Sequence, residues 1–178
     1  MRERIIAYAA IALVMVAATT APLERVQARS APSGVFYHDQ SGTAITGAAA
    51  ASARRLASAR LAFTVGLPAR WPGGTALRAL WVMDHHTPRF AVLYYGDDGG
   101  YIACQLHESL AGTNVSLGWA TRKPITVGTV QGTLLQSNIG GANPVSEIVW
   151  RLHGVRYDLL GSTGTSLATV LDMAASVA

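Results

Sequence analysis

The residues SEIVWRLHGVRYDLLG, 146 to 161, decide the fold because they have the pattern of two strands joined by a tight turn. Apolar and polar residues alternate on both sides of His153-Gly154, as in strands with one buried face. A two-residue connection that contains glycine suits the positive φ angles of a hairpin turn. The alternation predicts which side chains face one another across this hairpin: Ile148, Trp150 and Leu152 opposite Val155, Tyr157 and Leu159.

A second hairpin is predicted earlier in the chain. RFAVLYY (89 to 95) and YIACQLHE (101 to 108) are rich in aromatic and β-branched residues. The loop Gly-Asp-Asp-Gly-Gly, 96 to 100, separates them. The two runs should therefore pair as antiparallel strands.

Two further stretches extend the predicted sheet. LRALWVM, 77 to 83, alternates so that Leu77, Ala79, Trp81 and Met83 are expected on one face. PITVGTVQGTLLQ, 124 to 136, predicts either one strand or two short ones, with Gly128 and Gly132 marking a bulge or turn.

Helices are predicted before and after these strands. The run AAAASARRLASARLAF, 48 to 63, consists mainly of strong helix formers and ends before Gly66 and Pro68. At the other end, Thr165 or Ser166 can cap a final helix. The apolar face of that helix has the spacing i, i+3, i+4 and i+7: Leu167, Val170, Leu171 and Ala174. The sequence thus predicts an α+β fold: an antiparallel sheet of about five or six strands flanked by an N-terminal and a C-terminal helix. One face of the sheet should be covered, and the other should face water or a partner.

The N-terminal segment has the layout of a signal peptide. Arg2 and Arg4 precede IIAYAAIALVMVAATTA, residues 5 to 21, seventeen residues without a charge. A helix of that length spans roughly 25 Å, the short limit for crossing a bilayer. The site Val-Gln-Ala favours cleavage after Ala28, and a retained membrane anchor is the alternative. Either outcome places the rest of the chain outside the cytoplasmic membrane.

These patterns predict three parts: residues 1 to 28 as signal peptide or anchor, 29 to 48 as a flexible tether, and 49 to 178 as one extracytoplasmic α+β domain. Half of the residues are apolar and 13% are charged, so the domain should fold. The net charge of +4 is spread along the chain, which argues against a nucleic-acid partner. The oligomeric state is left open.

The sequence gives little support for a disulfide, a reactive cysteine or a metal site. Cys104 is the single cysteine, so no intramolecular disulfide can form, and its alternation with Ile102 and Leu106 predicts a buried apolar role. A metal site can be drawn from five residues: Asp84, His85, His86, His107 and Glu108. Adjacent residues of a strand point to opposite faces, so these are interpreted as exposed turn residues and neither a metal nor a cofactor is predicted.

Aromatic residues are the best candidates for a ligand or partner surface. Alternation assigns Trp81 and Trp150 to inward faces. A surface is instead expected from Trp71, Trp119, Tyr95 and Tyr101, because such side chains combine apolar area with a polar edge.

Motifs over residues 50 to 178 resemble a bacterial domain of unknown function. They are Phe63, Pro68 and Pro72, then the Tyr-containing hairpin, and finally Trp150 followed by GVRYDLLG, 154 to 161. That domain lies on the outer side of the membrane, often C-terminal to a membrane segment in anti-sigma-factor-like and sporulation-associated proteins. The resemblance implies fold and location but no catalytic residues. Only residues 1 to 4 precede the apolar run, so this chain by itself has no segment to hold a sigma factor.

The function expected from the sequence is a non-enzymatic extracytoplasmic binding or sensory module, whose partner is a membrane protein of the cell envelope. A carrier or structural module for an apolar or lipid-like ligand on the uncovered sheet face is the alternative. An envelope hydrolase ranks third, because the sequence contains no G-x-S-x-G motif.

Overall fold

The computed structural model describes residues 34–38, 44–84, 89–110, 121–137 and 144–177. The apolar run at 5 to 21 and Trp119 lie outside them, as do His85 and His86. The described elements, in chain order, are β1 (Gly34–His38), α2 (Gly47–Arg60), β2 (Ala76–Met83), β3 (Phe90–Gly96), β4 (Ile102–Ser109), β5 (Thr121–Val127), β6 (Val130–Gln136), β7 (Ser146–Leu152), β8 (Val155–Gly161) and α3 (Leu167–Ala175). Within these ranges, neither helix combines the length and the hydropathy that a membrane span requires.

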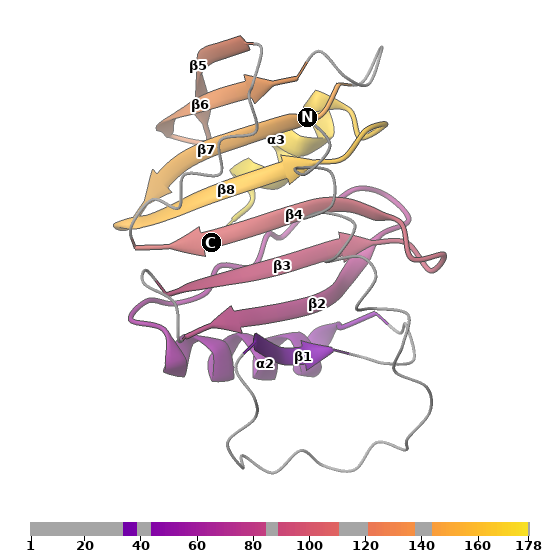
Figure 1. Ribbon diagram of the computed structural model, residues 1–178, viewed down its shortest axis with the longest axis vertical. Coiled ribbons are helices and arrows are strands. Elements are labelled where there is room, and N and C mark those ends of the chain that lie inside the picture. Colours follow the sequence, from indigo (N-terminus) through magenta and orange to yellow (C-terminus); the bar gives the residue numbers. More distant parts are fainter. Residues whose placement is uncertain (1–33, 39–43, 85–88, 111–120, 138–143, 178) are drawn as a thin grey trace, which may run out of the picture. The chain divides into compact units, whose positions relative to one another are not determined.

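The strands form one antiparallel sheet in the order β1-β2-β3-β4-β8-β7-β6-β5 (Figure 1). Strands β2 to β4 and β5 to β8 are each linked to their sequence neighbours, and the pairing of β4 with β8 joins the two groups. The α+β class is confirmed, but the expected count of five or six strands is too low. β2 to β8 already supply seven strands, and β1 adds an edge strand inside the stretch predicted to be a tether.

Both predicted hairpins are present. In the hairpin of β7 and β8, Ile148 lies opposite Leu159 and Trp150 opposite Tyr157, as the alternation required. His153 and Gly154 have φ angles of 49° and 81°, so both turn residues have positive φ. The ambiguous stretch from 124 to 136 belongs to two strands, β5 and β6, because Gly128 at φ 58° allows the chain to reverse there.

The core lies between the sheet and the two helices. One row of buried aliphatic residues crosses six strands: Leu80, Leu93, Leu106, Leu159, Ile148 and Leu134. Helix α2 packs on β1 and β2 at one end of the sheet, and α3 packs on β7 and β8 in its other half (Figure 1). Of the two predicted caps of α3, Thr165 and Ser166, it is Ser166 that caps the helix: its Oγ accepts a hydrogen bond from the backbone N–H of Thr169 at 3.2 Å.

Residues 61 to 75, called the strap here, connect α2 to β2 and reach α3 on the way. Pro68 forms an isolated bridge with Val177. The N–H of Ala69 donates to the carbonyl of Ser176 at 3.0 Å. The layer over the core face therefore consists of α2, the strap and α3.

A bulge in β2 corrects one prediction. Leu77 pairs with Tyr95 but Ala79 pairs with Tyr94, so Arg78 is an extra residue that reverses the alternation. Leu77 therefore faces the core, whereas Ala79, Trp81 and Met83 lie on the face that α2 and α3 do not cover, called the helix-free face here. Trp150 is buried in the core as expected, but the inward assignment of Trp81 is wrong: its half-buried ring lies 6.2 Å from that of Tyr94.

Candidate functional site: a groove along α2 above a buried glutamate

Three of the four aromatic residues expected to form a surface, Trp71, Tyr95 and Tyr101, lie within the described residues, and they differ in exposure. Trp71 and Tyr101 are 44% and 47% exposed, whereas Tyr95 is only 1% exposed. The ring of Tyr95 lies 6.0 Å from that of Trp71, and the Tyr101 hydroxyl donates a hydrogen bond to the carbonyl of Thr163. Trp71 thus partly covers a core residue. Trp119 lies outside the described residues.

Of the residues considered for a metal site, Asp84, His107 and Glu108 lie within the described residues. Asp84 forms an ion pair with Arg60 at 3.3 Å. His107 and Glu108 are successive residues of β4, so their side chains lie on opposite faces of the sheet. In the part of the chain that the structure describes, no three His, Cys, Asp or Glu side chains come together.

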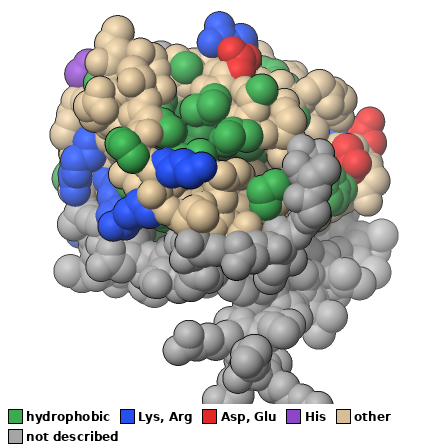
Figure 2. Space-filling view, turned by 90° about the horizontal axis from the view of Figure 1, so that it is seen from above, with side chains coloured by type: hydrophobic (Ala, Val, Ile, Leu, Met, Phe, Trp, Pro, Cys, Tyr) green, Lys and Arg blue, Asp and Glu red, His purple; other side chains and the backbone are tan. Residues whose placement is uncertain are grey.

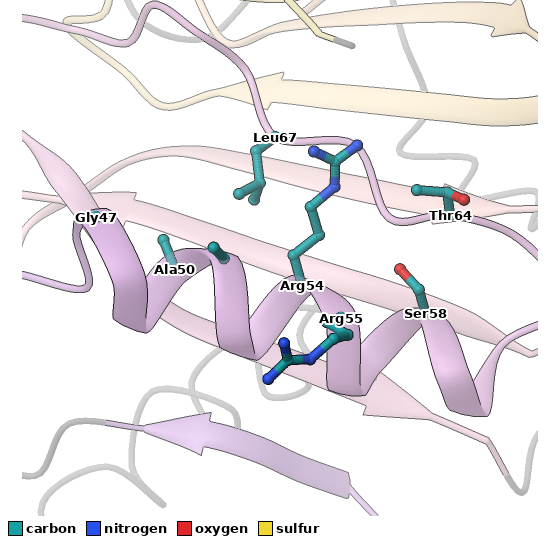
Figure 3. A pocket seen from close by; sticks show the side chains of 8 residues that line it. Gly47, Ala50, Arg54, Arg55, Ser58, Thr64 and Leu67 are labelled. Carbon is teal, nitrogen blue, oxygen red and sulfur yellow. The ribbon is translucent and has the colours of Figure 1, made fainter.

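A groove of about 490 Å³ runs between α2 and the strap (Figure 3). Its lining consists of Gly47, Ala50, Ala51, Arg54, Arg55, Ser58, Thr64 and Leu67. Figure 3 shows Arg54 and Ser58 turned toward the strap, with the Arg54 guanidinium between Leu67 and Thr64, and Arg55 turned away from the strap. These eight residues include two guanidinium groups and two hydroxyl groups but no carboxylate.

Three side chains hold the strap beside this groove at two consecutive residues, Val65 and Gly66. The N–H of Val65 donates to Ser58 Oγ at 2.9 Å, and Arg54 Nε donates to the carbonyl of Val65 at 2.7 Å. The N–H of Gly66 donates to Glu108 Oε2 at 2.8 Å. The position of the strap therefore depends on two groove residues and on one residue of the sheet.

Glu108 is the most unusual residue of the core. It lies between Ala91 and Tyr157 in the sheet and is 0% exposed. Its Oε2 accepts the hydrogen bond from Gly66, while its Oε1 has no hydrogen-bond partner in the part of the chain that the structure describes. Burial raises the pKa of this carboxyl to about 8, although the Gly66 hydrogen bond and the charge of Arg54 act in the opposite direction.

The interpretation of Glu108 as an exposed turn residue is therefore wrong. The signal that could have found it is the alternation of β4, since Cys104, Leu106 and Glu108 share one face. The same alternation correctly predicts that Cys104 is buried, and burial raises the pKa of its thiol to about 12.

The helix-free face has a polar centre between aromatic and aliphatic side chains. His107 lies directly opposite Asp158, whose carboxylate accepts three hydrogen bonds of 2.7 to 3.0 Å from Arg156. Burial lowers the pKa of His107, and the charge of Asp158 partly offsets that effect. The His107 ring stacks on Phe90, with centroids 6.3 Å apart.

The β5–β6 end of the sheet shows hydrophobic side chains gathered between positively charged ones (Figure 2). Ile125 and Val130 are half-buried there and pack against the core. Arg122 and Lys123 are exposed on β5. We therefore regard the apolar side chains at this end as the outer margin of the core rather than a separate site.

Comparison with family models, with curated proteins and with solved structures yields no match for this chain.

Proposed function

We propose that this chain is a non-enzymatic binding or sensory domain of the bacterial cell envelope, which acts outside the cytoplasmic membrane by binding an acidic segment of a protein partner in the α2 groove. The observation that carries the proposal is the groove itself, whose eight lining residues include two arginines and no carboxylate. The signal-peptide layout of the N-terminus supports the location. A membrane protein of the envelope is the expected partner.

The chemistry of the groove suits carboxylates. A guanidinium group presents several N–H donors in a planar array that matches a carboxylate in geometry and charge. The helix adds no competing anion, since α2 carries three arginines, Arg54, Arg55 and Arg60, and no acidic residue. Ser58 and Thr64 add hydroxyl groups that can donate further hydrogen bonds.

The shape of the groove suits a peptide. Gly47, Ala50 and Ala51 have small side chains, so a partner backbone can approach α2 closely. A volume of about 490 Å³ holds a few side chains and is too small for a folded partner, the rest of which would lie on the exposed surface of α2. Leu56, 48% exposed on that helix, offers an apolar contact there.

A peptide-binding measurement tests the groove. We expect a fluorescent hexaglutamate peptide to bind the full-length chain in nonionic detergent at low salt, with fluorescence anisotropy as the readout. Arg55→Glu should weaken binding about tenfold or more, because it reverses one of the two positive charges of the groove lining. Arg55 is exposed and points away from the strap, so the fold should tolerate the change.

The matched control is Arg122→Glu, the same change of charge at an exposed position of β5. It should leave the affinity close to that of the unchanged chain. Equal weakening of peptide binding by both variants would show that only the net charge of the chain matters. Absence of binding at low salt would refute the groove as a site for acidic peptides.

A carrier function is the second candidate, and the helix-free face favours it. Trp81 and Tyr94 form an edge-to-face pair on that face, and the buried indole Nε1 of Trp81 meets no acceptor among the described residues. An apolar ligand with a hydrogen-bond acceptor would satisfy that donor. Mass spectrometry of material extracted with organic solvent from the purified chain distinguishes the two functions: a stoichiometric lipid-like molecule, lost in Trp81→Ala, would support the carrier.

A further inference from the structure

We infer that proton binding to Glu108 regulates the α2 groove, so that the groove binds an acidic segment more tightly when Glu108 is neutral than when it is ionised. This inference rests on the proposed function of the groove and adds a form of regulation to it. Glu108 does not line the groove, so its effect has to pass through Arg54 and the strap.

The geometry joins Glu108 to the groove at two points. The first is the strap, where Glu108 holds Gly66 while Arg54 and Ser58 hold Val65. The second is electrostatic, because the positive charge of Arg54 interacts with the Glu108 carboxyl. A change in the charge of Glu108 therefore acts on the same guanidinium that lines the groove and on the backbone that forms its wall.

The groups that interact with Glu108 come from four neighbouring parts of the fold: α2, the strap, β3 and β8. Arg54 of α2 favours the ionised form, and the N–H of Gly66 in the strap does the same. Tyr95 of β3 and Tyr157 of β8 also interact electrostatically with Glu108. The Glu108 carboxyl contributes, after burial, to raising the pKa of both phenols, and that of Tyr157 rises to about 12. Both phenols are therefore neutral throughout the range in which Glu108 titrates.

The direction of the effect follows from competition for one positive charge. When Glu108 is neutral, it adds no negative charge to oppose the attraction between Arg54 and an anion in the groove. When Glu108 is ionised, its negative charge cancels part of that field and repels the incoming carboxylate. By linkage, a bound acidic segment should also raise the pKa of Glu108.

The test measures hexaglutamate affinity of the full-length chain in nonionic detergent from pH 7 to 9.5, at constant ionic strength. The peptide carboxylates and the arginines keep their charges over this range. We expect the affinity of the unchanged chain to fall about fivefold or more across it, within the range of typical coupling. Glu108→Gln keeps an oxygen that can accept from Gly66 but cannot ionise, so its affinity should stay at the low-pH value throughout.

A second readout follows Glu108 without a peptide. The ¹⁵N and ¹H chemical shifts of the Gly66 amide should titrate with Glu108 in the unchanged chain and stay constant in Glu108→Gln. Titration of Gly66 together with equal pH profiles for the two chains would overturn the regulation while leaving the groove as a binding site. Absence of hexaglutamate binding at every pH would overturn both the groove and its regulation.

Discussion

At the scale of single residues, Glu108 carries a carboxyl group that is buried in the core. Its carboxyl lies among apolar and aromatic neighbours, and the burial that raises its pKa to about 8 destabilises the ionised form. An unfolded glutamate has a pKa near 4.3. Between these two values the unfolded chain loses a proton that the folded chain retains.

The contribution of Glu108 to the free energy of unfolding should therefore be most favourable at low pH. It should fall as the pH rises from about 4 and level off above the folded pKa of about 8. Glu108→Gln should remove this dependence and stabilise the chain at pH 9 by a few kcal/mol, since each pKa unit corresponds to about 1.36 kcal/mol. Urea denaturation of both chains at pH 5, 7 and 9 checks this. Parallel curves of unfolding free energy against pH for the two chains would show that the pKa of Glu108 is the same in the folded and unfolded states.

At the scale of elements, the contact of β8 with α3 depends on the absence of one side chain. A Cβ at Gly161 would lie 2.5 Å from Val170 Cγ2, and Val170 is fully buried in α3. Gly161→Ala should therefore destabilise the chain by about 1–3 kcal/mol through overpacking.

Val170→Ala removes the methyl group that an alanine at Gly161 would meet. Alone it should cost about 2 kcal/mol by leaving a cavity. The double variant should be more stable than the sum of the two single changes predicts, with a coupling of about 1 kcal/mol or more in chemical denaturation. Strict additivity would show that α3 shifts away from β8 instead of meeting the new methyl group.

Elements with local signals were predictable from the sequence, and those set by pairing between distant residues were not. Alternation and glycine turns identified β3, β4, β7 and β8, and the capping residues Thr165 and Ser166 indicated where α3 begins. The bulge at Arg78 was missed because a single extra residue is visible only against a partner strand. It moved Trp81 to the helix-free face.

The groove could not be predicted for the same reason. It forms where the strap passes α2, and residues 42 positions apart, Gly66 and Glu108, fix that path. Nothing in the local sequence of the strap indicates this partner. Of the residues expected to form a functional surface, Trp71 and Tyr101 are exposed and Tyr95 is buried, because alternation within β3 places Tyr95 rather than Tyr94 on the core face.

At the scale of the whole molecule, the single thiol reports on global opening. Cys104 lies in the central strand β4 with 0% exposure, and burial raises its pKa to about 12. We expect a disulfide reagent at pH 8 to label it only as fast as the domain unfolds, and stoichiometrically in denaturant. Ala59→Cys, at an exposed position of α2, should provide a second thiol that reacts at once. Immediate reaction of Cys104 in the unchanged chain would contradict the burial of β4.

The junction of β4 with β8 has a consequence for synthesis on the ribosome. The first three-stranded group, β2 to β4, is complete when residue 109 has been made, but the partner of its inner edge is β8, which ends at Gly161. Until about fifty more residues have emerged from the exit tunnel, β4 presents unpaired backbone groups to its surroundings. During that interval the edge of β4 can pair with another chain, and the arrival of β8 removes that possibility.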